Sequence, residues 1–188
     1  MADIVLFHHA GGLTRGVIAF ADRLRAAGHS VETPDVFGGY TFDDIEDGMR
    51  YAGELGDEEL AERAFEAVST LPAGLVYVGM SLGCALAAQV LLTRGDAQGA
   101  VFLYGAVAPG WFGEDWPDGV PAQSHQTEYD PRREVEVDTA MEYEIPGAEM
   151  YLYPGSGHLF AEAGHEDYDP EAAQLALNRI LRFLEAIA

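Results

Sequence analysis

Leu75-Val76-Tyr77-Val78-Gly79-Met80-Ser81-Leu82-Gly83 joins an apolar run to a G-x-S-x-G pattern, and alanine- and leucine-rich sequence follows to residue 93. The apolar run at residues 75–78 predicts a buried strand, and residues 82–93 predict a helix, so that Ser81 falls on the turn between them. A serine that is to attack a carbonyl group has to project from a sharp turn, which the flanking glycines allow to close. The pattern alone is weak, but its strand–turn–helix context favours a nucleophile elbow over a turn in which Ser81 only caps the helix.

The rest of the chain alternates short apolar runs with longer amphipathic segments. Further strands are expected at residues 4–7, 30–33, 100–104, 120–125 and 149–153, and further helices at about residues 14–28, 133–143 and 169–187. Apolar strands that alternate with helices predict a parallel sheet covered on both faces. The expected fold is a single three-layer α/β domain over residues 1–188, with about six mostly parallel strands and no insertion long enough for a lid domain.

The composition is strongly acidic, with 32 Asp and Glu residues against ten arginines and no lysine, which gives a formal charge of −22. Such a charge argues against nucleic acid or an anionic membrane surface as a partner, because both would repel the chain. Ten of the acids lie in residues 43–66, where Ala61 and Phe65 continue an apolar stripe to Val68. This segment therefore predicts helices with solvated faces rather than a disordered linker.

Segments that would target the chain to a membrane or an oxidising compartment are not expected. No apolar run approaches the roughly 20 residues needed to cross a bilayer, and the N-terminus lacks the basic lead-in of a signal peptide. The one cysteine, Cys84, cannot form an internal disulfide. We therefore expect a cytoplasmic protein. We also expect it to be a monomer or a small homo-oligomer.

A serine nucleophile needs a general base and an acid that orients the base, in the chain order serine, acid, histidine for this type of elbow. The loop Gly155-Ser156-Gly157-His158 follows the expected strand at residues 149–153, so His158 lies where side chains converge at the carboxyl edge of a parallel sheet. Asp130 lies in the loop after the fifth expected strand and can also cap the following helix. Glu128 and Asp138 compete with it for the role of the acid. Ser81, Asp130 and His158 form the predicted triad.

The remaining parts of such a site are donors for an oxyanion and a pocket for the substrate. One backbone donor is expected from Leu82 at the start of its helix, and the other from the loop at residues 8–12. Six aromatic side chains gather in two loops, at residues 37–42 and 111–116, and predict an apolar pocket, although each ring taken singly is better explained by sealing the core. The residues assigned to this pocket are His8, Phe37, Trp111 and Trp116.

A metal-dependent hydrolase is an alternative, because two histidines share the first loop. His8, His9 and His125 would be its ligands, with His158 as a further one. Cysteines and carboxylates at ligand spacing are missing, and the elbow explains the site without metal, so no metal and no cofactor are expected. A second alternative is a non-catalytic homologue that binds a small acyl or lactone ligand.

The chain resembles the dienelactone hydrolase family of the α/β-hydrolase superfamily in motifs spread over most of its length. They are residues 5–12, Thr33-Pro34-Asp35, residues 79–83, Tyr104-Gly105-Ala106, Asp130-Pro131, residues 153–158 and Asp167-Tyr168-Asp169-Pro170. This resemblance implies an α/β-hydrolase fold and a cofactor-free hydrolase of small esters or lactones, with Ser81, Asp130 and His158 as its triad. It also implies that His9 supplies the second oxyanion donor beside Leu82.

This sequence departs from the family pattern in three ways. The best-known members use a cysteine nucleophile where this chain has Ser81, and Cys84 lies three residues further on, where it is expected to pack as a small apolar residue. Those members also place a glutamate in the oxyanion loop, at the position of His8 here. The chain begins at the superfamily's third strand, so the sheet is expected to lack the two leading strands. The expected reaction is acyl transfer to Ser81 and then to water, on a substrate that is not strongly anionic.

Overall fold

The computed structural model describes residues 1–187 and places six strands of this segment in one sheet, in the order β2-β1-β3-β4-β5-β6. All neighbouring strands run parallel. The strands are β1 (Asp3–Phe7), β2 (Ser30–Glu32), β3 (Val76–Met80), β4 (Gly99–Leu103), β5 (Ala122–Thr127) and β6 (Glu149–Tyr153). The predicted six-stranded parallel sheet is confirmed.

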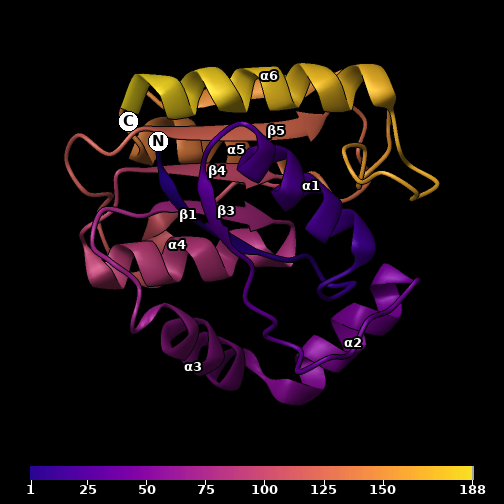
Figure 1. Ribbon diagram of the computed structural model, residues 1–188, viewed down its shortest axis with the longest axis horizontal. Helices are drawn as coiled ribbons and strands as arrows, with labels where there is room; N and C mark the ends of the chain where they lie inside the picture. The colour runs from indigo at the N-terminus through magenta and orange to yellow at the C-terminus, as the bar shows by residue number, and fades with distance from the viewer. Residues whose placement is uncertain (188) are drawn as a thin grey trace.

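Helices connect the strands and cover both faces of the sheet, as Figure 1 shows for α6 on one side and α3 and α4 on the other. The helices are α1 (Arg15–Ala26), α2 (Ile45–Leu55), α3 (Asp57–Val68), α4 (Leu82–Arg94), α5 (Val135–Glu144), α6 (Pro170–Ile187) and the short 3-10 helix η1 (Pro109–Phe112). Side chains of α1 and α6 form the core on one face, and those of α2, α3, α4 and α5 join the core on the other. The predicted three layers are therefore present.

Strand β1 illustrates how an apolar run specifies this arrangement. Successive side chains of a strand point to opposite faces. Ile4 and Leu6 accordingly join the core beneath α1 and α6, whereas Val5 and Phe7 join the core on the side of α4. All four are buried, because helices cover both faces of the sheet at this strand.

The fifth strand differs most from its prediction. Residues 120–125 were expected to form it, but β5 begins at Ala122 and continues to Thr127 through five consecutive polar residues that are all buried. These side chains bond to one another and to neighbouring segments: Ser124 Oγ donates to Gly105 O, and Gln126 Nε2 donates to Asp138. A strand that satisfies polar groups in this way has no apolar run that could indicate its end.

The acidic segment forms α2 and α3, as predicted. The Asp44 side chain caps α2 by accepting from the Glu46 N–H, and Gly56, at φ 82°, separates the two helices. Their acids point mostly to solvent, while Ala52, Leu60 and Ala64 are buried. Between residues 1 and 187, no helix has both the length and the apolar composition that crossing a membrane requires.

Candidate active site

Ser81 lies on a strained turn between β3 and α4. Its φ of 50° falls in a region that L-residues rarely adopt, and its N–H donates to Leu103 O at 2.8 Å. Both flanking glycines are required by close packing. A Cβ on Gly79 would lie 2.5 Å from Cα of Cys84, and a Cβ on Gly83 would lie 2.7 Å from His8 O. The turn is therefore held against α4 on one side and against the loop after β1 on the other.

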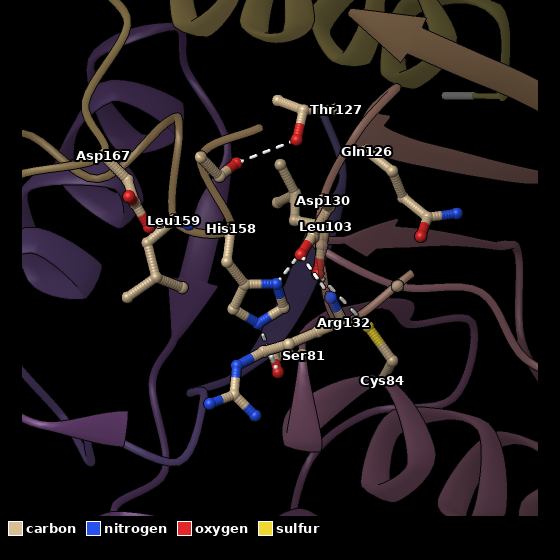
Figure 2. A network of polar contacts seen from close by, with 12 residues as sticks. Ser81, Cys84, Leu103, Gln126, Thr127, Asp130, Arg132, His158, Leu159 and Asp167 are labelled. Carbon is tan, nitrogen blue, oxygen red and sulfur yellow. Dashed lines mark hydrogen bonds and ion pairs between the residues drawn. The ribbon is translucent and has the colours of Figure 1, made fainter. Parts of the chain in front are cut away.

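His158 bridges Ser81 and Asp130 (Figure 2). Its Nε2 lies 2.9 Å from Ser81 Oγ, and its Nδ1 lies 2.7 Å from Asp130 Oδ2. Because a carboxylate can only accept, Nδ1 carries the proton and donates it to Asp130, which leaves Nε2 to accept the Ser81 hydroxyl proton. The structure thus brings together the three side chains predicted as the triad, from loops that follow β3, β5 and β6.

Three hydrogen bonds to backbone carbonyls fix the loop of Asp130 to the loop of His158. Glu128 N–H donates to Tyr153 O at 2.8 Å, Tyr129 N–H donates to Gly155 O at 3.0 Å, and Thr127 Oγ1 donates to Gly157 O at 3.0 Å. The two backbone bonds continue the pairing of β5 with β6 past the last residue of β5. The separation of the acid and the base is therefore set by the sheet.

The two competing acids do not reach His158. Glu128 points to solvent. Asp138 is buried on α5, where its two oxygens accept from Gln126 Nε2 and Arg133 Nε, each at 2.7 Å. Asp138 thus satisfies polar groups of β5.

Two backbone N–H groups beside the elbow are available to a negatively charged oxygen. Leu82 is the first residue of α4, where N–H groups have no acceptor within the helix. The His9 N–H has no hydrogen-bond acceptor among residues 1–187, and His9 O accepts from Gly12 N–H at 2.9 Å. The loop at residues 8–12, for which the second donor was predicted, lies against Gly83, next to the elbow.

A cavity of about 250 Å³ opens beside Ser81 and His158. Trp111, predicted as a pocket residue, lines it. Phe112, one of the six loop aromatics that predicted the pocket, lines it as well, whereas the walls formed by Tyr104, Val107 and Val137 were not predicted from the sequence. Tyr104 directly follows β4 at φ 64°, and this strained backbone, which no sequence pattern indicates, directs its ring to within 5.8 Å of the His158 ring.

The structure corrects the other three pocket assignments, because His8, Phe37 and Trp116 are buried in the core and do not line this cavity. Trp116 donates from Nε1 to Val120 O at 2.7 Å. His8 packs edge-on against Phe37, donates from Nδ1 to His9 O at 2.8 Å and accepts at Nε2 from Val36 N–H. Burial lowers the pKa of His8 to about 4, so it remains neutral.

The histidines considered as metal ligands have separate surroundings. His125 is buried on β5, stacks on Tyr151 and lies with Nδ1 2.8 Å from the Tyr153 hydroxyl. Burial, and then the charge of Arg179, lower the pKa of His125 to about 3. Within residues 1–187, no three His, Cys, Asp or Glu side chains are grouped so that they could hold a metal ion.

Cys84 is buried on α4, and its side chain contacts the backbone at the end of β3 and of β4. Its thiol donates to Gly79 O at 3.3 Å and to Leu103 O at 3.4 Å. Burial raises the pKa of the Cys84 thiol far above its usual value, so the nucleophilic thiolate does not form. Ser81 is therefore the nucleophile candidate at the elbow.

Two further hollows neighbour this cavity and share lining residues, and we refer to the three hollows together as the groove. A second hollow of about 430 Å³ shares Arg132 and His158 with it, and a third of about 830 Å³ shares Asp43 and Glu166 with the second. The Arg132 guanidinium pairs with Glu46. The carboxylates that line the second hollow are Asp43, Asp44, Glu166 and Asp167.

Comparison with known proteins identifies similar sequences and folds. The profile of the dienelactone hydrolase family matches residues 2–188. A curated protein of Azospirillum brasilense, which bears the name of a carboxymethylenebutenolidase, is 33% identical over 101 residues, covering 52% of this chain and 44% of that protein. The alignment thus spans less than half of the relative's length.

Solved structures share the fold at low sequence identity. A dienelactone-hydrolase-like promiscuous phosphotriesterase from metagenomic libraries superimposes with a TM-score of 0.81 and 19% identity, over 100% of this chain and 87% of that one. A hydrolase from Oleispira antarctica gives a TM-score of 0.65 and 13% identity, over 97% and 91% of the two chains. These likenesses establish the α/β-hydrolase fold.

Proposed function

Because the chain belongs to the dienelactone hydrolase family, we propose that it is a serine hydrolase that cleaves small carboxylic esters or lactones through an acyl-enzyme. The observation that carries this proposal is the continuous hydrogen-bonded chain from Asp130 through His158 to Ser81 on the elbow. The same chain of groups activates serine for acyl transfer on several unrelated folds.

The proposed reaction begins when His158 Nε2 removes the proton from Ser81 Oγ, which bonds to the carbonyl carbon of the substrate. The N–H groups of Leu82 and His9 stabilise the oxyanion that forms. Asp130 stabilises the imidazolium, which then protonates the departing alkoxide as the bond between carbonyl carbon and alkoxide oxygen breaks. In a lactone this alkoxide stays tethered to the acyl group.

Water completes the cycle in the proposed mechanism. His158 takes a proton from the water molecule as its oxygen attacks the acyl carbon, and returns the proton to Ser81 as the acid leaves. Every proton is handled by His158, and the negative charge that develops on the carbonyl oxygen in each step faces the two backbone donors. No metal or cofactor takes part in these steps.

Labelling with a fluorophosphonate tests the proposal. We expect the wild type to gain one adduct on the peptide that contains Ser81 and to lose ester hydrolysis in proportion to labelling, while Ser81→Ala gains no adduct. Ser69→Ala is the matched control, because Ser69 lies at the end of α3 and donates to Glu66 O. A wild type that takes up no probe and hydrolyses no ester, lactone or thioester would favour the non-catalytic alternative.

The carboxylates that line the groove predict that the enzyme prefers substrates with a positively charged leaving group. A cationic thioester such as acetylthiocholine should be cleaved with several-fold higher kcat/KM than an uncharged thioester of the same shape, because carboxylates raise the local concentration of cations. An anionic analogue should be cleaved more slowly. The differences should shrink at 1 M salt, where the Debye length is about 3 Å.

The charge of the groove can be altered without touching the triad. Asp43→Asn combined with Glu166→Gln should reduce the preference for the cation. Equal kcat/KM values for cationic, neutral and anionic substrates at low salt would contradict this prediction. The comparison uses initial rates at several ionic strengths.

A further inference from the structure

A buried polar cluster joins the loop after β1 to the loop that carries His158. His9 Nε2 lies 2.5 Å from Glu162 Oε2, and both side chains are almost fully buried. Thr14, the N-cap residue of α1, donates from Oγ1 to Glu162 Oε1 at 2.5 Å. The steps proposed for Ser81 use none of these three side chains.

The hydrogen bonds determine where the protons of this cluster lie. Gly11 N–H donates to His9 Nδ1 at 2.9 Å, so this nitrogen is unprotonated and the ring proton is on Nε2, facing Glu162. Burial raises the pKa of Glu162, but the hydrogen bonds from His9 and Thr14 outweigh it and hold that pKa below its usual value. Glu162 is therefore a carboxylate. With both ring nitrogens occupied, His9 is unsuited to proton transfer.

Two glycines make room for this pair. A Cβ on Gly11 would lie 2.6 Å from Cε1 of His9, so only glycine lets the ring fold back onto the N–H of residue 11. A Cβ on Gly16 would overlap the side chain of Glu162. Gly16 lies in the first turn of α1, a turn without acidic residues of its own. Glu162 thus provides the negative charge that the start of a helix favours.

We propose that Glu162 and His9 are positioning residues that hold the His9 backbone N–H at the site of the oxyanion. The inference rests on the proposed function, because it assigns that N–H a role in acyl transfer. Glu162 follows His158 by four residues on the same loop. One buried contact therefore fixes the oxyanion donor relative to the general base.

The first test is a comparison of two substitutions at Glu162. Glu162→Leu removes the acceptor for His9 and should lower kcat by about 10- to 100-fold, as expected when a reacting group is displaced by about 1 Å. KM should change by less than about twofold, since ground-state contacts remain. Glu162→Gln keeps an oxygen opposite His9 Nε2 and should retain most of kcat. Glu171→Gln, an exposed acid in the first turn of α6, is the matched control.

A double-mutant cycle distinguishes positioning from a general loss of structure. His9→Ala keeps the backbone N–H but removes the ring, so Glu162→Leu should cause no further loss of kcat in that background. Rates are normalised to the number of sites that react with fluorophosphonate, which removes the effect of unfolded protein. If Glu162→Leu fails to fold, Gly16→Ala displaces the carboxylate while leaving residue 162 unchanged, and it should lower kcat in the same way.

The outcomes separate this inference from the proposed function. A wild type without labelling or hydrolysis would overturn both. An active wild type whose kcat is unchanged by Glu162→Leu, or by Gly16→Ala where the former does not fold, would overturn the positioning role alone. The same conclusion follows if Glu162→Leu lowers normalised kcat equally with and without the His9 ring, or raises KM while leaving kcat unchanged.

Discussion

Replacing His158 by alanine is expected to lower kcat for the best ester substrate by about 10⁴- to 10⁶-fold. The imidazole is the only group within hydrogen-bond distance of Ser81 Oγ among the described residues 1–187 that could accept its proton. Ser81→Ala should cause a loss of similar size. The double variant should lose no more than either single variant, because the two side chains act in one step.

Substitution of Asp130 should also lower kcat, by a factor at the lower end of that range. Asp130→Asn preserves the shape of the side chain but can donate to His158 Nδ1, which favours the tautomer with its proton on Nε2 and blocks acceptance from Ser81. We expect kcat to fall by about 10⁴-fold. Glu128→Gln, two residues earlier and exposed, is the matched control and should retain activity. Melting curves establish that each variant is folded.

If the Glu128 variant lost more activity than the Asp130 variant, the assignment of Asp130 as the acid of the triad would be contradicted. A large loss in Glu128→Gln with little change in Asp130→Asn would mean that the loop after β5 rearranges when substrate binds. Residual activity in His158→Ala close to that of the wild type would exclude His158 as the general base.

The triad candidates and the sheet could be anticipated because their signals are local. Ser81 is marked by glycines within two positions of it, and His158 by the strand that ends five residues before it. Asp130 was harder to assign, since Glu128 lies on the same loop. Three-dimensional structure separates them, because the backbone bonds between the two loops direct Asp130 inwards and Glu128 outwards.

The features that the sequence did not reveal depend on contacts between distant residues. His9 and Glu162 are 153 positions apart, and neither stands in a pattern that indicates the other. Aromatic residues in loops can line a pocket or seal a core, and the choice depends on loop paths that periodicity does not determine. Trp111 lines the cavity, whereas Phe37 and Trp116 are buried away from it. The prediction placed strand β5 two residues too early in the chain, because buried polar networks have no apolar signature.

Two helical glycines allow a test of the close packing at the elbow. Gly83→Ala should lower the free energy of unfolding by about 3 kcal/mol, because the added methyl group overlaps the backbone carbonyl of Phe7 and approaches that of His8. For a chain of 188 residues, this corresponds to a decrease in Tm of about 6–12 °C. Activity should fall as well, since the displaced backbone directly precedes His9, the proposed oxyanion donor.

Gly53→Ala is the same chemical change in a different setting. Gly53 is exposed on α2, and a Cβ there would meet no atom within 4 Å. Alanine has the higher helix propensity, so this variant should be more stable than the wild type by about 0.5–1 kcal/mol. Thermal unfolding of the two variants should therefore shift in opposite directions. If both raise Tm, helix propensity would outweigh packing at Gly83, and the contact between α4 and the loop after β1 could not be what requires glycine there.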